Sequence, residues 1–343
     1  MKTVVLGKTG LRISELGFGG IPIIRLSPEE AVSVLRRAYD LGVTFFDTAN
    51  VYHDSEEKMG DAFLGIRDAI VLATKSMKRT AQGAADDIER SLKMLRTDRI
   101  DLFQFHQVSQ EADWQAITGP GGAMEAAEGA RKAGKILHIG ITSHSIPMAI
   151  RLIKTGFFET IQFPFNFIED EAALELHPIA RSLGLGILAM KPFAGGAISD
   201  ARTAFAFLRA HEGVVPIPGC DSVASVEEIA SFYRDGLVAT GEDLGRMRAI
   251  KDEIGTEFCR RCEYCMPCPR GIRIAQAMIY PLLAHRMSPA VASGFSKAVM
   301  DAVPDCVSCG ICTKRCPYSL PIPRLLRENH ELYLRHCSEV APD

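Results

Sequence analysis

The chain has 343 residues, of which 47% are hydrophobic and 24% are charged, with a formal net charge of -3. These values predict a globular protein with an ample core, too long for one average domain unless that domain is a barrel. The charge is nearly balanced, no basic patch is interleaved with aromatic residues, and no apolar run reaches the ~18 residues of a membrane helix, so we expect neither a nucleic acid nor a membrane partner.

The N-terminus carries charge but no following apolar stretch, so we predict no secretory signal and expect a cytoplasmic protein. Ten cysteines are many for such a protein. Eight of them lie between Cys259 and Cys316, which points to metal ligands more than to disulfides.

A hairpin is the first predicted element, with residues 3–6 and 11–14 flanking a turn at 7–10. From residue 15 the chain alternates short apolar strands with amphipathic helices. Ser27 and Pro28 open the first of these helices, and Glu29 and Glu30 lie in its first turn. The predicted strands cover residues 16–19, 43–46, 70–74, 100–105, 137–141, 160–165, 185–190 and 214–217.

Eight strands, each followed by a helix, over roughly 250 residues are typical of an α/β fold of the (β/α)8 TIM barrel type. Several of the predicted helices end at a glycine, as expected for C-terminal caps. A doubly wound sheet is the rival fold. However, the glycines after the first strand, Gly17, Gly19 and Gly20, do not follow the G-x-G-x-x-G pattern of a dinucleotide fingerprint.

Polar residues follow several of the predicted strands. Asp47 closes the second strand, with Tyr52 in the loop beyond it, while Lys75 closes the third and His106 the fourth. In a barrel of this kind the active site gathers at the carboxyl ends of the strands, so these four groups are expected at one mouth. Each alone has an ordinary structural interpretation, such as a helix cap, a loop charge or a near-core histidine.

Together the four side chains make chemical sense as a proton-transfer site. A tyrosine has an ordinary pKa of about 10, and a lowered pKa would let it exchange protons near neutrality. We expect Lys75 to supply the cation that lowers the pKa of Tyr52, and Asp47 to hold Lys75 charged and oriented. His106 would donate a hydrogen bond to a substrate carbonyl oxygen.

Over residues 1–240 the sequence resembles the aldo-keto reductase superfamily. The resemblance rests on F-D-T-A-N-V-Y, A-T-K, D-L-F-Q-F-H, H-I-G-I-T-S-H, I-Q-F-P-F-N, M-K-P-F-A-G-G and I-P-G in this order. It implies NAD(P)H-dependent reduction of an aldehyde or ketone by hydride transfer, with Tyr52 as general acid in a tetrad with Asp47, Lys75 and His106.

The same resemblance implies contacts to an NADP or NAD cofactor. The residues it assigns to these contacts are Gly20, Ser143, Gln162, Met190, Lys191, Pro192, Gly219 and Ser222. Three departures stand out: Thr142-Ser143-His144 replaces a common Ser-Asn, Met190 stands where many members have a tyrosine, and acids replace basic residues near the last helix. Because Asp221, Glu227 and Glu228 are poor neighbours for a 2'-phosphate, the choice between NADH and NADPH stays open.

Two cysteine runs follow a change of composition beyond residue 239. The first is C-x2-C-x2-C-x2-C-P and the second C-x2-C-x2-C-x3-C-P, which is the bacterial ferredoxin run. By the ferredoxin crossover we expect two 4Fe-4S clusters. The ligand sets are Cys259, Cys262, Cys265 and Cys316 for one cluster, and Cys268, Cys306, Cys309 and Cys312 for the other.

The runs are separated by 37 residues, and the long helical insert predicted from Ile272 to Met300 suggests an α-helical variant of the ferredoxin fold. The arrangement resembles the aldo-keto reductase branch with a C-terminal 4Fe-4S domain. Zinc is the alternative metal, although four cysteines per run exceed the paired C-x2-C of a tetrahedral site. We expect a barrel domain over residues 1–250 and an iron-sulfur domain over 251–343. Cys220 and Cys337 are interpreted as ordinary residues.

Two other functions stay open. One is a Schiff-base aldolase that uses Lys75 or Lys191 on the same barrel. The other is an electron-transfer or redox-sensing protein whose barrel binds nicotinamide without turnover, and a docking site for a redox partner protein stays open with it. The small-molecule carbonyl substrate cannot be named, because the loop at residues 107–122 that would form its walls has no readable shape.

Overall fold

The structure is a computed structural model that describes residues 1–254, 257–261, 265–316 and 318–340. It divides into two compact units. Unit 1 comprises residues 1–194 and 200–246, and unit 2 comprises residues 195–199 and 247–343. In the described ranges no helix combines the length and the apolar character needed to cross a membrane.

Unit 1 is built on eight parallel strands that follow one another in the sheet in chain order. These strands are β3 (Gly17–Gly19), β4 (Phe45–Asp47), β5 (Val71–Ser76), β6 (Ile100–Phe105), β7 (Ile136–Thr142), β8 (Thr160–Pro164), β9 (Gly186–Met190) and β10 (Val214–Pro216). The backbone amide of Gly19 donates to the carbonyl of Pro218 over 2.8 Å, which joins the first strand to the end of the last. The predicted (β/α)8 barrel is confirmed.

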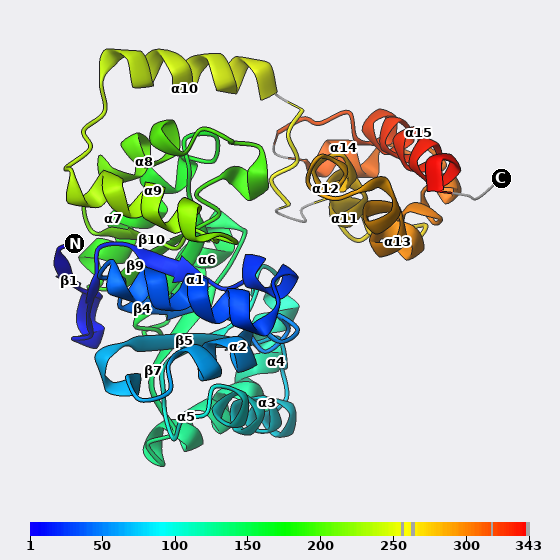
Figure 1. Ribbon diagram of the computed structural model, residues 1–343. Coiled ribbons are helices and arrows are strands. Elements are labelled where there is room, and N and C mark those ends of the chain that lie inside the picture. Colours follow the sequence, from blue (N-terminus) through cyan, green and yellow to red (C-terminus); the bar gives the residue numbers. More distant parts are fainter. Residues whose placement is uncertain (255–256, 262–264, 317, 341–343) are drawn as a thin grey trace. The chain divides into compact units, whose positions relative to one another are not determined.

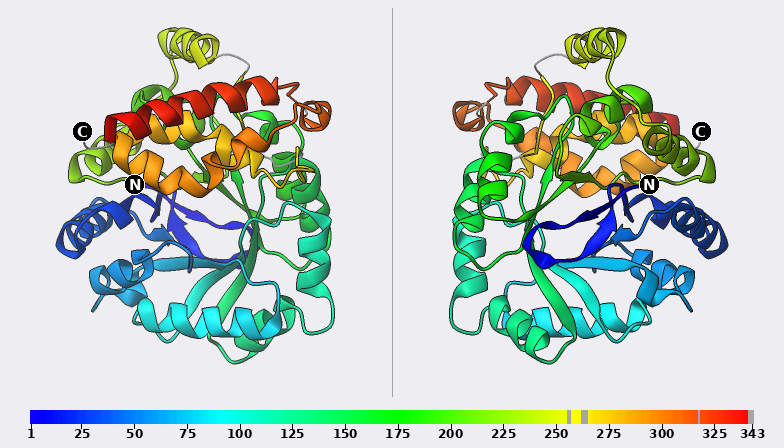
Figure 2. Two further views of the ribbon diagram at one scale, coloured as in Figure 1. Left: turned by 90° about the vertical axis from the view of Figure 1, so that its right-hand side faces the viewer. Right: turned by 90° about the vertical axis from the view of Figure 1, so that its left-hand side faces the viewer.

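The helices of unit 1 lie around the strands (Figures 1 and 2). They are α1 (Pro28–Asp40), α2 (Ser55–Ala62), α3 (Ala81–Met94), α4 (Glu111–Thr118), α5 (Ala123–Lys132), α6 (Ile146–Ile153), α7 (Leu176–Ser182), α8 (Ala201–Arg209) and α9 (Val223–Arg234). Helix α10 (Gly241–Ile254) begins in unit 1 and continues into unit 2. Ser27 and Glu30 form a capping box at the start of α1, because each side chain bonds to the backbone of the other. The predicted helix start is therefore confirmed.

A hairpin closes one end of the barrel. Strands β1 (Thr3–Val5) and β2 (Arg12–Ser14) pair antiparallel, and Leu6 and Ile13 belong to the apolar cluster that also contains barrel-strand residues such as Phe45 and Leu188. Gly7 has φ of +51°, and a Cβ there would lie 2.1 Å from the backbone nitrogen of Gly186. A glycine is required at this turn because both the conformation and the close approach exclude a side chain.

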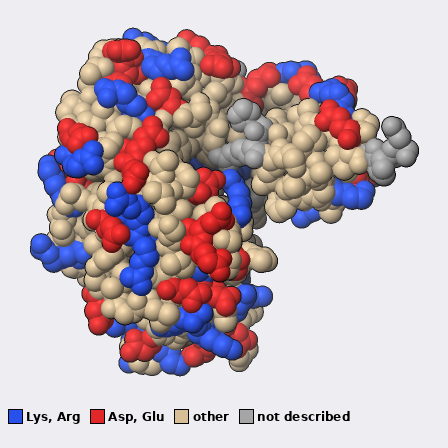
Figure 3. Space-filling model, viewed as in Figure 1, with Lys and Arg blue, Asp and Glu red and all other residues tan. Residues whose placement is uncertain are grey.

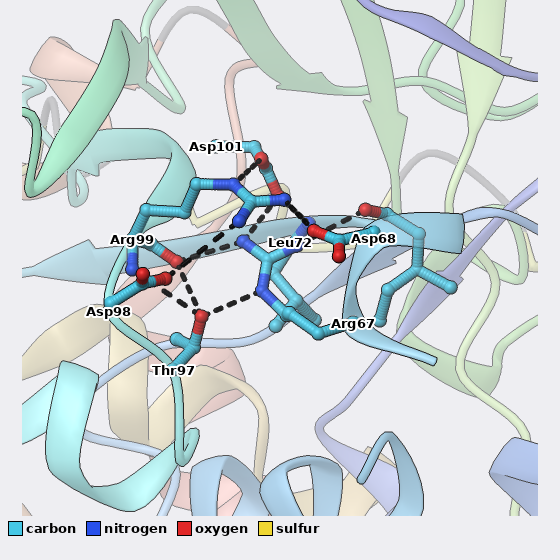
Figure 4. A network of polar contacts seen from close by, with 8 residues as sticks. Arg67, Asp68, Leu72, Thr97, Asp98, Arg99 and Asp101 are labelled. Carbon is cyan, nitrogen blue, oxygen red and sulfur yellow. Dashed lines mark hydrogen bonds and ion pairs between the residues drawn. The ribbon is translucent and has the colours of Figure 1, made fainter. Parts of the chain in front are cut away.

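A polar network holds β5 and β6 at the amino ends of these strands (Figure 4). Arg67, in the short helix η3 (Arg67–Ala69), donates to Asp101 over 2.8 Å, to Thr97 over 2.8 Å and to the carbonyl of Arg99 over 2.8 Å. The buried carboxylate of Asp101 also accepts from the backbone amide of Leu72 over 2.7 Å. One buried ion pair therefore joins two neighbouring strands to the segments that precede them.

Unit 2 is helical. Its helices are α11 (Ile274–Met278), α12 (Tyr280–Arg286), α13 (Pro289–Met300), α14 (Ile311–Arg315) and α15 (Ile322–Val340). Its buried core contains Ile272, Tyr280, Met300 and Leu326, and two of the cysteines, Cys265 and Cys312, belong to the same core. The predicted helical insert between the cysteine runs is confirmed, as three helices.

Acidic and basic side chains are interspersed over the face of unit 1 that Figure 3 draws. This mixture agrees with the small net charge of the whole chain.

Candidate active site and iron-sulfur ligands

Four predicted catalytic side chains come from the carboxyl ends of three neighbouring strands. Asp47 is the last residue of β4, Lys75 lies in β5 and His106 follows β6, while Tyr52 lies in the loop between β4 and α2. Since β4, β5 and β6 are parallel and adjacent, their carboxyl ends meet at one mouth of the barrel.

A buried ion pair forms the floor of this site. The Nζ atom of Lys75 donates to Oδ2 of Asp47 over 2.5 Å and to the carbonyl of Thr48 over 2.6 Å, and both charged side chains are almost fully buried. Gln104 and Gln162 donate to the same carboxylate over 3.1 and 3.5 Å. The carboxylate therefore receives three side-chain donors, which hold it and Lys75 in one arrangement.

Tyr52 and His106 lie side by side above this pair. The hydroxyl of Tyr52 is 3.5 Å from Nε2 of His106, and their rings meet edge to face with centroids 5.6 Å apart. The ammonium of Lys75 is 5.2 Å from the centroid of the Tyr52 ring. The structure thus brings the four predicted side chains together.

The expectation of a lowered pKa for Tyr52 is wrong for this structure. Burial raises the pKa of Tyr52 well above its usual range, and the negative charge of Asp47 raises it further. Sequence alone could not give this result, since it does not show how deeply the phenol is buried. Tyr52 is therefore a neutral hydroxyl that can give a proton, and not a resting phenolate.

Burial also shifts the pKa values of the other three groups. Burial lowers the pKa of Lys75 while Asp47 raises it, and burial raises the pKa of Asp47 while Lys75 lowers it. Burial, with the positive charges of Lys75, Arg79 and Lys191, lowers the pKa of His106 to about 3. His106 is therefore neutral at physiological pH. A neutral imidazole can donate a hydrogen bond, but it does not act as an imidazolium acid.

The predicted cofactor contacts also lie at carboxyl ends of strands. Gly20 follows β3, Ser143 follows β7, and Gln162 lies within β8. Met190 ends β9 with Lys191 and Pro192 after it, and Gly219 and Ser222 lie between β10 and α9. The backbone amide of Ser143 donates to the carbonyl of Gln162 over 3.2 Å, so these two contacts are neighbours.

Ser222 is the N-cap of α9, where its hydroxyl accepts from the amide of Ser225. The acids near this cap have basic partners that the sequence did not reveal. Arg25, in the helix η2 (Pro22–Arg25), pairs with Asp221 over 3.2 Å, and Arg37 of α1 pairs with Glu227 over 2.7 Å. Cations therefore stand beside the acids at the end of the barrel strands, which the linear pattern around residue 221 could not show.

Sequence reasoning gave no role to Gln104 or Glu56. Gln104 lies two residues before His106 and so on the same face of β6, a signal that the period of a strand makes readable. Glu56 is buried in the first turn of α2, and its carboxylate accepts from the hydroxyl of Thr74 over 2.6 Å. In the sequence it looked like an ordinary acid at a helix start.

The cysteine runs line two hollows in unit 2. One is lined by Cys265, Cys268, Cys306, Cys309 and Cys312; the other is lined by Cys259, Cys265 and Cys316. Cys262 lies outside the described residues. None of the nine described cysteines forms a disulfide. Apart from Cys265, which lines both hollows, these cysteines divide as the two expected ligand sets do.

Within the described ranges, no three His, Cys, Asp or Glu side chains already stand close enough to hold a single metal ion. A 4Fe-4S cluster places several iron atoms between its thiolates, so its ligands stand further apart than those of one ion. Two hollows lined mainly by thiols and apolar residues fit such a cluster better than a zinc ion.

Comparison with known families decides the class of the protein. A model described as the aldo/keto reductase family matches residues 15–213, more than half of the chain. The chain belongs to the aldo/keto reductase family. A second model, described as a 4Fe-4S dicluster domain, matches residues 258–321 of the same reductase. The protein is therefore an NAD(P)H oxidoreductase of this family with a C-terminal 4Fe-4S domain.

Curated relatives match the reductase over its barrel. The uncharacterized oxidoreductase YrpG of Bacillus subtilis (strain 168) is 30% identical over 226 residues, which are 57% of this chain and 68% of that protein. L-galactose dehydrogenase of Arabidopsis thaliana is 26% identical over 214 residues, which are 57% of this chain and 66% of that protein. The chain thus spans about two thirds of the length of these relatives.

Solved structures share the fold of the reductase. The aldo-keto reductase AKR11C1 from Bacillus halodurans superposes with a TM-score of 0.63 at 23% identity and covers 73% of this chain and 96% of its own. An aldo-keto reductase from Klebsiella pneumoniae, solved in complex with NADPH, gives a TM-score of 0.58 at 24% identity and covers 73% and 94%. At these identities the likeness supports the fold alone.

Proposed function

We propose that this reductase converts an aldehyde or ketone to an alcohol, with Tyr52 as the proton donor. The observation that carries the proposal is the pair of neutral hydrogen-bonding groups at the barrel mouth, the Tyr52 hydroxyl and Nε2 of His106, 3.5 Å apart. Two donors at this spacing can meet at one carbonyl oxygen.

Each of the four residues has its own role in the proposed reaction. When bound, a nicotinamide would supply the hydride for the carbonyl carbon, and the negative charge that develops on the carbonyl oxygen would be met by this chain's own residues. Tyr52 gives its proton to that oxygen, and neutral His106 donates a hydrogen bond to it. Lys75, 5.2 Å from the Tyr52 ring centroid, stabilises the phenolate that remains, and Asp47 holds Lys75 in place.

An aldolase reaction is less well supported. A Schiff base requires an uncharged amine, and Nζ of Lys75 is already bonded to a carboxylate and a backbone carbonyl.

The cofactor would lie across the carboxyl ends of five strands. Support comes from Gln162, whose buried Oε1 has no hydrogen-bond partner in the described part of the chain and could accept from a carboxamide. The Klebsiella pneumoniae relative was solved with NADPH, and we propose either NADPH or NADH here. The proposed contacts are Gly20, Ser143, Gln162, Met190, Lys191, Pro192, Gly219 and Ser222.

Replacement of the proton donor tests the mechanism. In Tyr52→Phe we expect carbonyl reduction to fall by about 10²- to 10⁴-fold, because a general acid contributes on this scale. Cofactor affinity, measured by fluorescence titration, should stay nearly unchanged, since the phenol gives its proton only as the substrate oxygen becomes negative. Tyr39→Phe, which removes a hydroxyl in α1 outside the mouth, is the matched control. Substantial residual activity in Tyr52→Phe would contradict the assignment.

We also propose that unit 2 holds two 4Fe-4S clusters. The ligand sets are Cys259, Cys262, Cys265 and Cys316 for one cluster, and Cys268, Cys306, Cys309 and Cys312 for the other. Support comes from the dicluster family match and from the two thiol-lined hollows. Such clusters supply one-electron chemistry when bound. The absence of disulfides among the described cysteines suits a reducing compartment, so we propose a cytoplasmic location.

Iron counting tests the cluster assignment. Anaerobically purified protein should contain about eight iron atoms per chain, as expected for two cubane clusters, and Cys268→Ala should lower the iron content. Cys220→Ala, which removes a buried cysteine of unit 1, is the control. Zinc in place of iron, or half the expected iron with Cys268→Ala unchanged, would contradict the two-cluster proposal.

We propose that residues 1–250 form the catalytic domain and residues 251–343 the iron-sulfur domain.

A further inference from the structure

One of the two thiol-lined hollows reaches the surface of unit 2. Cys309 is exposed, and the side chain of Val307, two residues before it, is 63% exposed. The other described cysteines of the two runs are buried or half-buried. Among the described residues, the exposed cysteine ligand therefore belongs to the hollow lined by Cys268, Cys306, Cys309 and Cys312.

Three arginines from different segments lie at this hollow or contact the loops that line it. Arg327 of α15 donates to the hydroxyl of Ser308 over 3.0 Å. Arg315 of α14 donates to the backbone carbonyl of Pro267 over 3.2 Å, next to Cys268, and Arg270 lines the hollow itself. Two of the three guanidinium groups are thus fixed by hydrogen bonds to the loops that carry the cysteines.

These arginines are exposed and have no ion pair with an acid anywhere in the described ranges. Arg324, one turn before Arg327, differs because it pairs with Glu257 and Glu328. Asp305, which precedes Cys306, is an exposed acid on the same loop. Three unpaired cations against one acid leave this surface positive.

The two parts of the chain also differ in the sign of their net charge. Residues 247–343 contain 13 Lys and Arg against 10 Asp and Glu, whereas residues 1–246 contain 26 against 32. A positive surface beside an exposed redox ligand therefore lies in a protein that is otherwise acidic. Complementary charge mainly determines which partner binds and how fast the two proteins associate. This electrostatic attraction is strong only at low ionic strength.

We propose that Arg270, Arg315, Arg327 and Val307, around Cys309, form the docking face for a small acidic one-electron carrier protein. With an iron-sulfur centre bound by the Cys309 loop, the exchange would move one electron from the reduced carrier to that centre, and no proton or group would move. A one-electron carrier is required because a 4Fe-4S centre accepts single electrons. The proposal rests on the iron-sulfur assignment and is independent of carbonyl reduction.

Binding provides a test that does not depend on activity. The probe is a plant-type 2Fe-2S ferredoxin, a small acidic protein, titrated calorimetrically into the anaerobically prepared full chain. We expect micromolar affinity at 20 mM salt that weakens at least tenfold at 200 mM. The triple variant Arg270→Gln, Arg315→Gln and Arg327→Gln should bind at least tenfold more weakly than the wild type at 20 mM salt, with unchanged iron content.

Two further variants separate a local docking face from general charge and from misfolding. The control Arg248→Gln, Lys297→Gln and Arg335→Gln removes the same charge from other exposed positions in the same part of the chain and should bind like the wild type. The triple exchange of the three docking arginines to lysine keeps the charge and should keep most of the affinity.

Equal weakening in the control variant would overturn the proposal, and so would absence of binding at 20 mM salt. Salt-sensitive self-association that disappears in the triple glutamine variant would assign the face to a second copy of the chain instead. Binding of a single-stranded oligonucleotide more tightly than ferredoxin, lost in the same variant, would assign it to nucleic acid.

Discussion

Lys75 is a buried cation with acids on both sides of its strand. Asp47 bonds to it directly over 2.5 Å on the barrel side. Neighbouring residues of a strand point to opposite faces, so the side chain of Thr74 lies on the helix side of β5. Its hydroxyl donates to the carboxylate of Glu56 over 2.6 Å, so Glu56 lies on that side as well. The charge of Glu56 also raises the pKa of Lys75, against the larger lowering effect of burial. We therefore interpret Glu56 as a positioning residue that helps to keep Lys75 charged.

Glu56→Gln tests this interpretation while preserving shape. Loss of the charge should let burial lower the pKa of Lys75 further, so the alkaline limb of the kcat/KM profile should move to lower pH, with kcat/KM reduced by roughly tenfold. Asp87→Asn is the matched control, because Asp87 is also buried and bonds to Ser76 over 2.5 Å on the same strand. If both variants moved the limb equally, a purely structural role would be the better explanation.

His177 is a buried histidine outside the catalytic site. Its side chain is 1% exposed, lies 4.5 Å from the ring of Phe165 and, in the described part of the chain, has no hydrogen-bond partner at either ring nitrogen. Burial, with the charge of Arg181 and the effect of His211, lowers its pKa to about 3. In the unfolded chain the same group has a pKa of about 6.5.

This difference predicts a loss of stability in acid. Between pH 6.5 and pH 3 the unfolded state binds a proton at His177 that the folded state does not, so stability falls as pH falls. From pH 7 to pH 5 the loss from this group is about 2 kcal/mol, and His177→Leu should remove it. Urea unfolding, followed through the single Trp114 of the barrel, measures the effect, and exposed His53→Gln is the control. Equal losses in wild type and His177→Leu would exclude this account.

The tetrad could be predicted from sequence because each member is a polar residue at the end of an apolar strand or in the loop after it. Packing of the core alone does not require a polar side chain at these positions. Gln104 and Glu56 were missed for different reasons. An amide within a strand and an acid in a first helical turn both have ordinary explanations, and only the fold shows that they bond to Asp47 and Thr74. The expected lowering of the Tyr52 pKa was wrong because pKa depends on burial, which the sequence pattern does not provide.

At the scale of elements, the eight strands were predictable because a buried parallel strand is a short continuous apolar run. The turn glycines were predictable as well, since Gly42, Gly134 and Gly156 all have positive φ. The contact of the N-terminal hairpin with the barrel was not, because it depends on Gly7 meeting Gly186, which are 179 residues apart in sequence. A contact between residues so far apart in the sequence leaves no pattern in the residues around either of them.

The ion pair between Arg67 and Asp101 offers a test at this scale (Figure 4). Arg67→Ala should reduce the free energy of unfolding by about 3 kcal/mol, because it leaves the nearly buried carboxylate of Asp101 without its main partner. Asp68→Ala removes a carboxylate that is 89% exposed and should leave stability nearly unchanged. Urea unfolding followed by Trp114 fluorescence measures both. Similar small effects from the two variants would show that the pair does not hold β5 and β6.

For the molecule as a whole, the two units carry chemistries that differ in electron count. A nicotinamide releases two electrons together as a hydride, whereas a 4Fe-4S centre accepts one at a time. Direct exchange between them would require a nicotinamide radical or a flavin to divide the pair, and the sequence has no flavin signature. Electrons from a separate one-electron carrier avoid this difficulty.

We therefore predict that the nicotinamide does not reduce the iron-sulfur centres directly during carbonyl reduction. Anaerobic, oxidised protein mixed with excess NADH or NADPH should keep its visible iron-sulfur absorption and show no paramagnetic resonance of reduced clusters over many turnovers. Dithionite, a one-electron reductant, should bleach the same sample and confirm that the centres are competent. Bleaching by NADH or NADPH at the rate of carbonyl turnover, without an added mediator, would show that hydride chemistry in the barrel and one-electron chemistry in unit 2 form a single pathway.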